Sequence, residues 1–326
     1  MSLAIIVTTN EGNVLAADSM ETYRNAIGDV RMGSETRMKL FQLNKHVGAM
    51  ACGISFLENK NIQQHIQQFK CEYDLESMEI ADIVDKLYDY FSHIYSKFLS
   101  NYAEGQKKRL EEKKYKNVEY RFELECVIFN YVDDKGHKQE QKFYQSILEF
   151  LVTGHDENKN NMVYKITLPD PKDKNGVVLK LSKEQSGATW IGQTDVLIRI
   201  IRGWSPEIKR LKIINDLSPP QKAELLRQID DQEYVINWGT MTLQDAVEFC
   251  ELAMKITESI QKITDGTWSL PGSSPGVGGA VDIAVVTAEK GFRWIQKKKI
   301  RINDNEIDLD ELESVKEMCK VISKEK

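Results

Sequence analysis

The chain opens with short runs of apolar and β-branched residues that are separated by polar turns. Ser2–Thr9 and Val14–Ala17 flank a turn that contains Gly12, which is the pattern of a β-hairpin. Lys39–Leu43 and His46–Cys52 repeat this pattern around a second polar turn. The sequence therefore predicts that four strands come first.

Helical periodicity follows these strands and returns later in the chain. Ile54–Phe69 turns helical, and apolar residues then recur at helical spacing from Ile80 to Phe98. A later helical block contains Val196–Ile201, Pro220–Asp230 and a long amphipathic segment, Leu243–Ile263. Before and after this block, the pattern predicts further strands at Phe122–Val132, Ile147–Thr153, Met162–Leu168, Val177–Leu181, Ala188–Ile191 and Val281–Thr287.

This order of elements predicts an α+β fold. Two stacked, mainly antiparallel sheets, each covered on its outer face by a pair of helices, would bury every apolar face in the pattern. Such an arrangement is a four-layer αββα sandwich. We expect one domain over residues 1–326, because no Pro/Gly-rich linker divides the chain.

Composition narrows the class of protein. The 326 residues are 41% hydrophobic and 29% charged, which is typical of a globular protein. No apolar run approaches the roughly 18 residues of a membrane span, and no signal peptide is apparent, so we expect a cytoplasmic protein that does not bind a membrane. The net charge of −6 argues against a nucleic-acid partner.

The spacing of His and Cys residues predicts neither a metal site nor any cofactor. The five cysteines form no C-x-x-C pair, and we expect them to be free thiols. No H-E-x-x-H motif and no phosphate-binding P-loop occurs in the sequence.

Ser2, directly after the initiator methionine, is the candidate nucleophile. Removal of Met1 would place a hydroxyl and a free α-amine on one residue. An α-amine has a pKa of about 7.7–8.0, so much of it is neutral near pH 7 and can accept the proton of the hydroxyl beside it.

Several short motifs, taken in order, resemble a known family. They are Ala16-Ala17-Asp18-Ser19, Thr22, Lys39-Leu40-Phe41, Met50-Ala51-Cys52-Gly53 and, late in the chain, Gly278-Gly279-Ala280-Val281-Asp282. Their order and spacing resemble the proteasome β-type subunits of the N-terminal nucleophile (Ntn) hydrolases, including the bacterial relatives of that group. The family has the four-layer αββα fold and includes threonine-type peptidases.

The resemblance implies a role for particular residues. Ser2 takes the place of the nucleophilic threonine, Lys39 that of the catalytic lysine, and Asp18 that of its acidic partner. Gly53 would donate a backbone N–H to the oxyanion, and Thr22 would pair with an extended peptide. Further residues fall at positions that line the specificity pocket or support the amine: Arg37, Phe41, Ala51 and Ser55 for the pocket, and Gln193, Thr194 and Ser274 as accessory groups.

Counting outward from the Asn10–Asn13 turn gives an expected register for the first hairpin. This count places Ser2 opposite Glu21 and Asp18 nearer Ile5. At about 3.3 Å per residue, Asp18 would then lie on the order of 10 Å from Ser2.

These observations favour a proteasome-like peptidase that forms an acyl-enzyme at Ser2. Two alternatives stay open: an Ntn amidase that acts on a small amide, and an inactive assembly protein with the same fold. The resemblance also implies a homo-oligomeric ring or spiral and an ATP-driven AAA+ unfoldase as a possible partner. Relative to the family, the chain carries insertions around residues 101–143 and 169–185.

Overall fold

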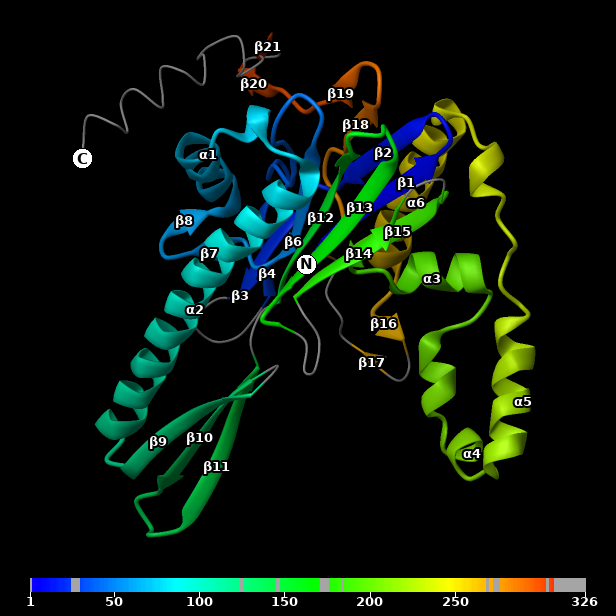
Figure 1. Ribbon diagram of the computed structural model, residues 1–326. Helices are drawn as coiled ribbons and strands as arrows, with labels where there is room; N and C mark the ends of the chain where they lie inside the picture. The colour runs from blue at the N-terminus through cyan, green and yellow to red at the C-terminus, as the bar shows by residue number, and fades with distance from the viewer. Residues whose placement is uncertain are drawn as a thin grey trace.

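The computed structural model describes residues 2–24, 30–123, 126–144, 147–170, 176–182, 185–267, 270–271, 276–302 and 305–307. It shows a mixed α+β protein whose sheets are mainly antiparallel, as the sequence predicts (Figure 1). No helix within these ranges is both long and apolar enough to cross a membrane.

The first large sheet combines strands from the start, the middle and the late part of the sequence. Its order is β15 (Gly187–Gly192), β1 (Leu3–Thr9), β2 (Gly12–Ala17), β18 (Asp282–Thr287) and β19 (Gly291–Gln296). Every residue of β1 and β2 is buried. Continuous apolar runs such as these form strands that are covered on both faces.

The second large sheet comes from the middle of the sequence, together with the second predicted hairpin. Its order is β14 (Val177–Leu181), β13 (Asn161–Leu168), β12 (Leu148–His155), β6 (Gly48–Gly53) and β5 (Leu40–Gln42). The predicted hairpin around Asn44 is confirmed, since β5 pairs with β6 in antiparallel register.

The two sheets face each other through a shared apolar cluster. Ala4 and Ile6 of β1 lie in it with Met50 of β6 and Leu151 of β12. The alternate residues of β1 point the other way, because successive strand side chains lie on opposite faces.

Helices cover the outer faces of both sheets (Figure 1). Helices α3 (Asp195–Arg202) and α6 (Leu243–Ile263) pack on the first sheet. Helices α1 (Ile62–Glu72) and α2 (Ile80–Glu112) pack on the second, whose outer face contributes Phe41 and Phe150 to their common core. The apolar stripe predicted from Ile80 to Phe98 is therefore the face that α2 buries.

The first predicted helix begins later than the periodicity indicates. Residues from Phe56 form a small hairpin, β7 (Phe56–Leu57) and β8 (Lys60–Asn61), with positive φ at Glu58 and Asn59. Helix α1 then starts at Ile62, because Asn61 caps it and exchanges hydrogen bonds with Gln64 in a capping box.

Two parts extend from the sheets (Figure 1). The far end of α2 carries a three-stranded sheet of β9 (Lys116–Glu123), β10 (Cys126–Val132) and β11 (Lys138–Tyr144), within the expected 101–143 insertion. The single strand predicted at Phe122–Val132 is wrong, because β9 and β10 pair with each other there. Helices α4 (Lys212–Asn215) and α5 (Pro219–Asp230) form the second extension.

The remaining short elements complete the described chain: β3 (Glu21–Arg24), β4 (Val30–Ser34), β16 (Gly266–Thr267), β17 (Leu270–Pro271), β20 (Ile300–Ile302), β21 (Asn305–Ile307) and the 3-10 turns Leu75–Ser77, Pro206–Arg210 and Trp238–Thr240. Cys52, Cys126 and Cys250 are free and buried, as expected. Cys71 is disulfide-bonded, so the expectation of a free thiol there is wrong. Cys319 lies outside the described residues.

Candidate active site

The first hairpin has a tighter turn than the sequence count assumes. Thr9 pairs with Gly12 across a two-residue turn, Asn10–Glu11, and Ala4 pairs with Ala17. Asp18 therefore lies opposite Leu3, and its backbone N–H donates to the Leu3 carbonyl at 3.2 Å. The expected register, which put Asp18 nearer Ile5, is wrong, because a shorter turn moves one strand past the other.

Asp18 is the centre of a buried hydrogen-bond network. Its Oδ1 accepts from the backbone N–H of Leu3 at 3.0 Å and from Lys39 Nζ at 2.9 Å. Its Oδ2 accepts from the N–H groups of Met20 and Gly278, each at 3.1 Å. One carboxylate thus joins the first strand, the segment after β2, the lead into β5 and the segment before β18.

Opposing effects act on the charge of Asp18. Burial raises the pKa of its carboxyl above the ordinary value, while the Lys39 ammonium and the N–H groups of Leu3 and Gly278 act in the opposite direction. Each carboxylate oxygen already accepts two hydrogen bonds, and a proton on either would displace a donor. The contacts therefore fit the ionised form of Asp18.

Lys39 lies directly before β5, and its side chain is only 7% exposed. Besides the ion pair with Asp18, its Nζ donates to the Met20 carbonyl. Lys39 and Asp18 thus form a buried ion pair, in which each side chain supplies the counter-charge of the other.

Ser2 is held in place by the residues at the end of β15, the edge strand of the first sheet. Its residue is 4% exposed, and its carbonyl accepts from the Gln193 N–H at 2.6 Å. Gly192, at the end of β15, lies so close that a Cβ there would sit 2.0 Å from the same carbonyl, and its φ is +88°. Glycine is thus required for Ser2 to occupy this place. Met1 lies outside the described residues.

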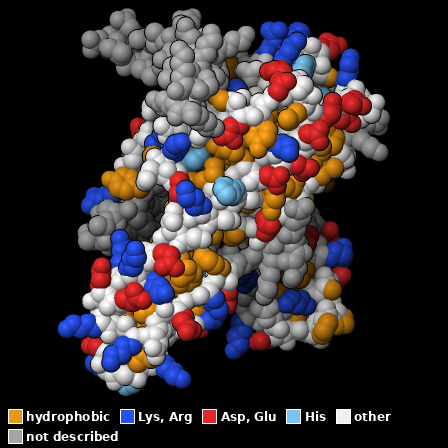
Figure 2. Space-filling model, turned by 60° about the vertical axis from the view of Figure 1, so that its left-hand side comes forward, with side chains coloured by type: hydrophobic (Ala, Val, Ile, Leu, Met, Phe, Trp, Pro, Cys, Tyr) orange, Lys and Arg blue, Asp and Glu red, His pale blue; other side chains and the backbone are white. Residues whose placement is uncertain are grey.

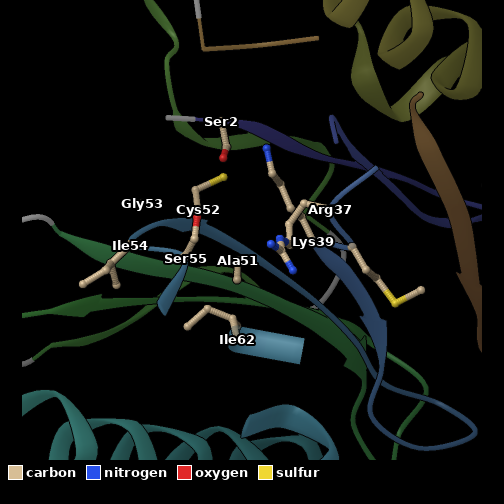
Figure 3. A pocket seen from close by; sticks show the side chains of 10 residues that line it. Ser2, Arg37, Lys39, Ala51, Cys52, Gly53, Ile54, Ser55 and Ile62 are labelled. Atoms are coloured by element: carbon tan, nitrogen blue, oxygen red, sulfur yellow. The ribbon is translucent and has the colours of Figure 1, made fainter. Parts of the chain in front are cut away.

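A small pocket opens beside Ser2, with a volume of about 20 Å³. Figure 3 shows the Ser2 hydroxyl pointing into it, with the Cys52 sulfur close below and the Lys39 side chain alongside. A volume of roughly 10–15 Å³ is enough for one water molecule, so the pocket offers room for little more than one small group.

The predicted residues that line this pocket are Ser2, Arg37, Lys39, Ala51, Gly53 and Ser55. The structure thus brings Ser2 and Lys39 together with Arg37, Ala51 and Ser55, three of the four residues predicted for a specificity pocket. Four further lining residues were not predicted from the sequence: Met38, Cys52, Ile54 and Ile62. Three of them adjoin predicted positions in the chain, which is the signal that could have found them.

Gly53 ends β6 with a φ of +104°, and a Cβ there would lie 1.8 Å from the Ile147 carbonyl. The Ala51 N–H, two residues earlier, points toward the β5 side and donates to the Lys39 carbonyl at 2.9 Å. Alternate residues of a strand direct their N–H groups to the same side, so the Gly53 N–H points that way too. Strand β5 begins at Leu40 and pairs with β6 only as far as Met50, so no described strand lies opposite Gly53 on this side. The pocket that Gly53 lines lies there instead.

Arg37 forms the polar wall of the pocket. Its Nε donates to Glu21 Oε2 at 2.7 Å, and its guanidinium lies 5.2 Å from the centre of the Phe56 ring. Glu21 is 6% exposed, so this ion pair is well shielded from water on one side.

Cys52 brings a thiol into the lining of the same pocket. Burial raises the pKa of its thiol, which the nearby Lys39 charge only partly opposes. A thiol held in its protonated form is a poor nucleophile. Cys52 therefore fits a packing role here, next to Gly192.

Other predicted site residues lie away from the pocket. Phe41 is buried in the core beneath α1 and α2. Thr22 lies in β3, which pairs with β4 alone among the described strands. Gln193 binds Ser2 through its backbone, while its side chain accepts from Gln261. Thr194 is the N-cap residue of α3, but its side chain makes no capping hydrogen bond there. Ser274 lies outside the described residues.

A second buried charge pair lies behind Asp18, and the sequence did not point to it. Lys298 Nζ donates to Asp282 and, at 2.8 Å, to the hydroxyl of Ser19, which donates in turn to the Ala280 carbonyl. Asp282 is fully buried. Burial lowers the pKa of Lys298, while Asp282 opposes this shift. The pair fixes the segment next to Asp18.

Comparison with known proteins adds no assignment, since neither a protein-family model nor a curated protein matches the chain. Within the described ranges, no group of three or more His, Cys, Asp or Glu side chains is placed to hold a metal ion.

Proposed function

We propose that this chain is an Ntn amidohydrolase of the proteasome β type, with the four-layer αββα sandwich of that family, acting in the cytoplasm. Support for the fold comes from two facing antiparallel sheets, each covered by helices on its outer face. Support for the chemistry comes from Ser2 and Lys39, which line one pocket.

One observation carries the proposal: the buried Asp18–Lys39 ion pair lies one residue from the candidate nucleophile. Asp18 bonds both Lys39 and the N–H of Leu3, the residue after Ser2. An ammonium at this place disfavours a second positive charge on the Ser2 amine. The amine, once Met1 is removed, then stays available as a base.

The reaction would proceed in two balanced steps. Ser2 Oγ attacks the carbonyl carbon of the amide while its proton passes to the α-amine of Ser2. The Gly53 N–H donates to the oxyanion, and collapse expels the amine product, which takes that proton and leaves an ester on Oγ. Water then attacks the ester, giving a proton to the α-amine, and Oγ recovers it as the acid leaves.

The size of the pocket bears on the substrate. A volume of about 20 Å³ suits a small side chain or a small acyl group better than a large one. Within the proposed class, this favours the variant that cuts a small amide, or a peptide with a small residue before the scissile bond.

Other features bear on a peptide substrate. Strand β3 has one edge that no described strand covers, and an extended peptide could add there as a further strand. A homo-oligomeric ring or spiral, and delivery of unfolded protein by an AAA+ partner, belong to the same proposal.

Intact-mass measurement and a peptide epoxyketone test this function together. The reagent forms its stable ring adduct only with a hydroxyl and a free amine on the same residue. We expect a mass that lacks Met1 and one adduct on Ser2, which is lost in Ser2→Ala. Ser100→Ala, which removes the hydroxyl of an exposed serine on α2 outside the pocket, should keep the adduct.

A contrary result would favour the inactive assembly protein. If Met1 is removed and the protein is folded, yet neither the epoxyketone nor a small β-lactone modifies Ser2, the enzymatic proposal is overturned.

A further inference from the structure

Lys298 is a buried lysine that the reaction proposed for Ser2 does not use. Lysine side chains are mostly exposed in proteins, and Figure 2 shows Lys and Arg side chains at the surface of one face, beside Asp and Glu. The side chain of Lys298 is only 9% exposed, and that of its partner Asp282 is fully buried. Apolar residues of similar volume often stabilise a core as well as a buried ion pair does, so stability alone is a weak reason for this pair.

Asp282 binds both nitrogen atoms of Lys298. Its Oδ1 accepts from the backbone N–H at 2.9 Å, and its Oδ2 accepts from Nζ. Asp282 begins β18 and lies opposite Ala17, the residue before Asp18. The pair therefore fixes the segment after β19 against the end of β2, next to Asp18.

Ser19 connects the Lys298 ammonium to the segment that follows β2. Its hydroxyl accepts from Lys298 Nζ at 2.8 Å and donates to the Ala280 carbonyl. Its backbone N–H donates to the Gly278 carbonyl at 3.0 Å, and its own carbonyl accepts from the Arg37 N–H at 3.0 Å. One residue thus joins the segments that precede β18 and β5 to the end of β2.

The residues on either side of Ser19 supply the acceptors of Lys39. Asp18 Oδ1 accepts from Lys39 Nζ at 2.9 Å, and the Met20 carbonyl accepts from the same ammonium. The Met20 N–H also donates to Asp18 Oδ2 at 3.1 Å. A displacement of Ser19 would move both acceptors, so the place of the Lys39 ammonium depends on what holds Ser19.

The charges of the two pairs also influence one another. Burial lowers the pKa of Lys298, the Asp282 carboxylate opposes this shift, and the Lys39 ammonium adds to it. Because the force between two charges is mutual, the Lys298 charge acts on Lys39 in turn. With Asp18, these side chains form one cluster of two cations and two anions.

We propose that the Lys298–Asp282 pair is a positioning pair for the Ser2 site. By holding Ser19, it keeps both acceptors of Lys39 where the ammonium lies beside Ser2. Neither Lys298 nor Asp282 lines the pocket, so the pair acts through Lys39 and touches no substrate. This inference rests on the function proposed above, since it concerns the reactivity of Ser2.

The kinetics of epoxyketone adduct formation test this role. In the Asp282→Asn/Lys298→Met double variant, we expect the maximal rate at saturating reagent to fall by up to about 100-fold, because small displacements of reacting groups are costly. The half-saturating concentration should stay unchanged, since neither residue lines the pocket. Mass spectrometry also gives the final labelled fraction, which partial unfolding would lower.

Two single variants serve as companions to the double variant. Ser19→Ala keeps both charges and removes only the hydroxyl between Lys298 and the Ala280 carbonyl, and it should also lower the maximal rate. Lys290→Met removes an exposed lysine between β18 and β19 and should react like the wild type.

A spectroscopic readout does not need the reaction. In spectra of protein that contains ¹⁵N-labelled lysine, the Lys39 Nζ resonance should move in Ser19→Ala and stay unchanged in Lys290→Met. An unreactive wild type in which this resonance moves would overturn the reaction proposed for Ser2, while the link from Ser19 to Lys39 stands. A reactive wild type whose maximal rate is matched by Ser19→Ala and by the folded double variant would overturn this inference alone.

Discussion

Lys39 Nζ lies 2.9 Å from Asp18 Oδ1, and both side chains are almost wholly removed from water. Neither charge is stable there alone, because isolated ions are costly to bury. The same carboxylate also accepts the Leu3 N–H, so the ion pair and the start of the first strand are fixed together.

Asp18→Asn should lower both the stability of the fold and the reactivity of Ser2. An amide leaves Lys39 without a counter-charge, and breaking a buried pair in this way costs about 3–5 kcal/mol. The Asp18→Asn/Lys39→Met double variant removes both charges and should regain part of that loss, while Ser2 stays unreactive. Urea unfolding and the epoxyketone adduct measure the two effects. A reactive double variant would contradict the role given to Lys39.

Gly192→Ala should displace Ser2. The new Cβ would meet the Ser2 carbonyl at 2.0 Å on a backbone with positive φ, and such a backbone alone costs about 1–3 kcal/mol for alanine. We expect lower thermal stability and loss of the Ser2 adduct.

The matched control is Gly105→Ala in α2, where no atom lies within 4 Å of the added Cβ. Alanine in a helix interior stabilises by roughly 0.5–1 kcal/mol relative to glycine. Equal behaviour of the two variants would refute the steric argument.

Acid should destabilise the fold through its buried histidines. Burial lowers the pKa values of His65 and His155 below the ordinary 6.5. As pH falls below about 6.5, the unfolded chain takes up protons that the folded chain still refuses, so the free energy of unfolding decreases. Urea unfolding across this pH range should show that the free energy of unfolding decreases less in His155→Gln than in the wild type. Parallel curves would contradict the prediction.

Lys298→Met should weaken the fold although the residue lies outside the pocket. It leaves Asp282, which is fully buried, without its cation, at a cost of about 3–5 kcal/mol. The Asp282→Asn/Lys298→Met double variant should recover part of the loss in thermal unfolding. Arg227→Met, which breaks exposed ion pairs with Glu224 and Asp231, should change stability little. Equal losses of stability in Lys298→Met and Arg227→Met would show that the buried pair stabilises the fold no more than an exposed one.

Sequence alone predicted the α+β class and most elements, because long apolar periodicities survive into the fold. Helix α6 occupies the predicted Leu243–Ile263 without change. The register of the first hairpin was wrong, since the choice between a two-residue and a longer turn depends on local backbone angles that composition does not fix.

The candidate site was predictable to the extent that its residues belong to short motifs. Ser2, Asp18, Lys39 and Gly53 do meet at one place. Lys298 was not predictable, because a lysine 279 positions from Ser19 carries no local signal of their contact. Phe41 was misplaced toward the pocket, since its side chain is buried in the core beneath α1 and α2.

The small sheet at the end of α2 has an apolar centre of its own, built from Ala103, Leu110, Val118, Val127 and Phe129. Segments with separate centres open as separate units. Amide protons of β9 to β11 should therefore exchange with deuterium sooner than those of β1 and β2. The small sheet of β9 to β11 would then unfold, or adapt its shape to another surface, while β1, the strand that follows Ser2, stays folded.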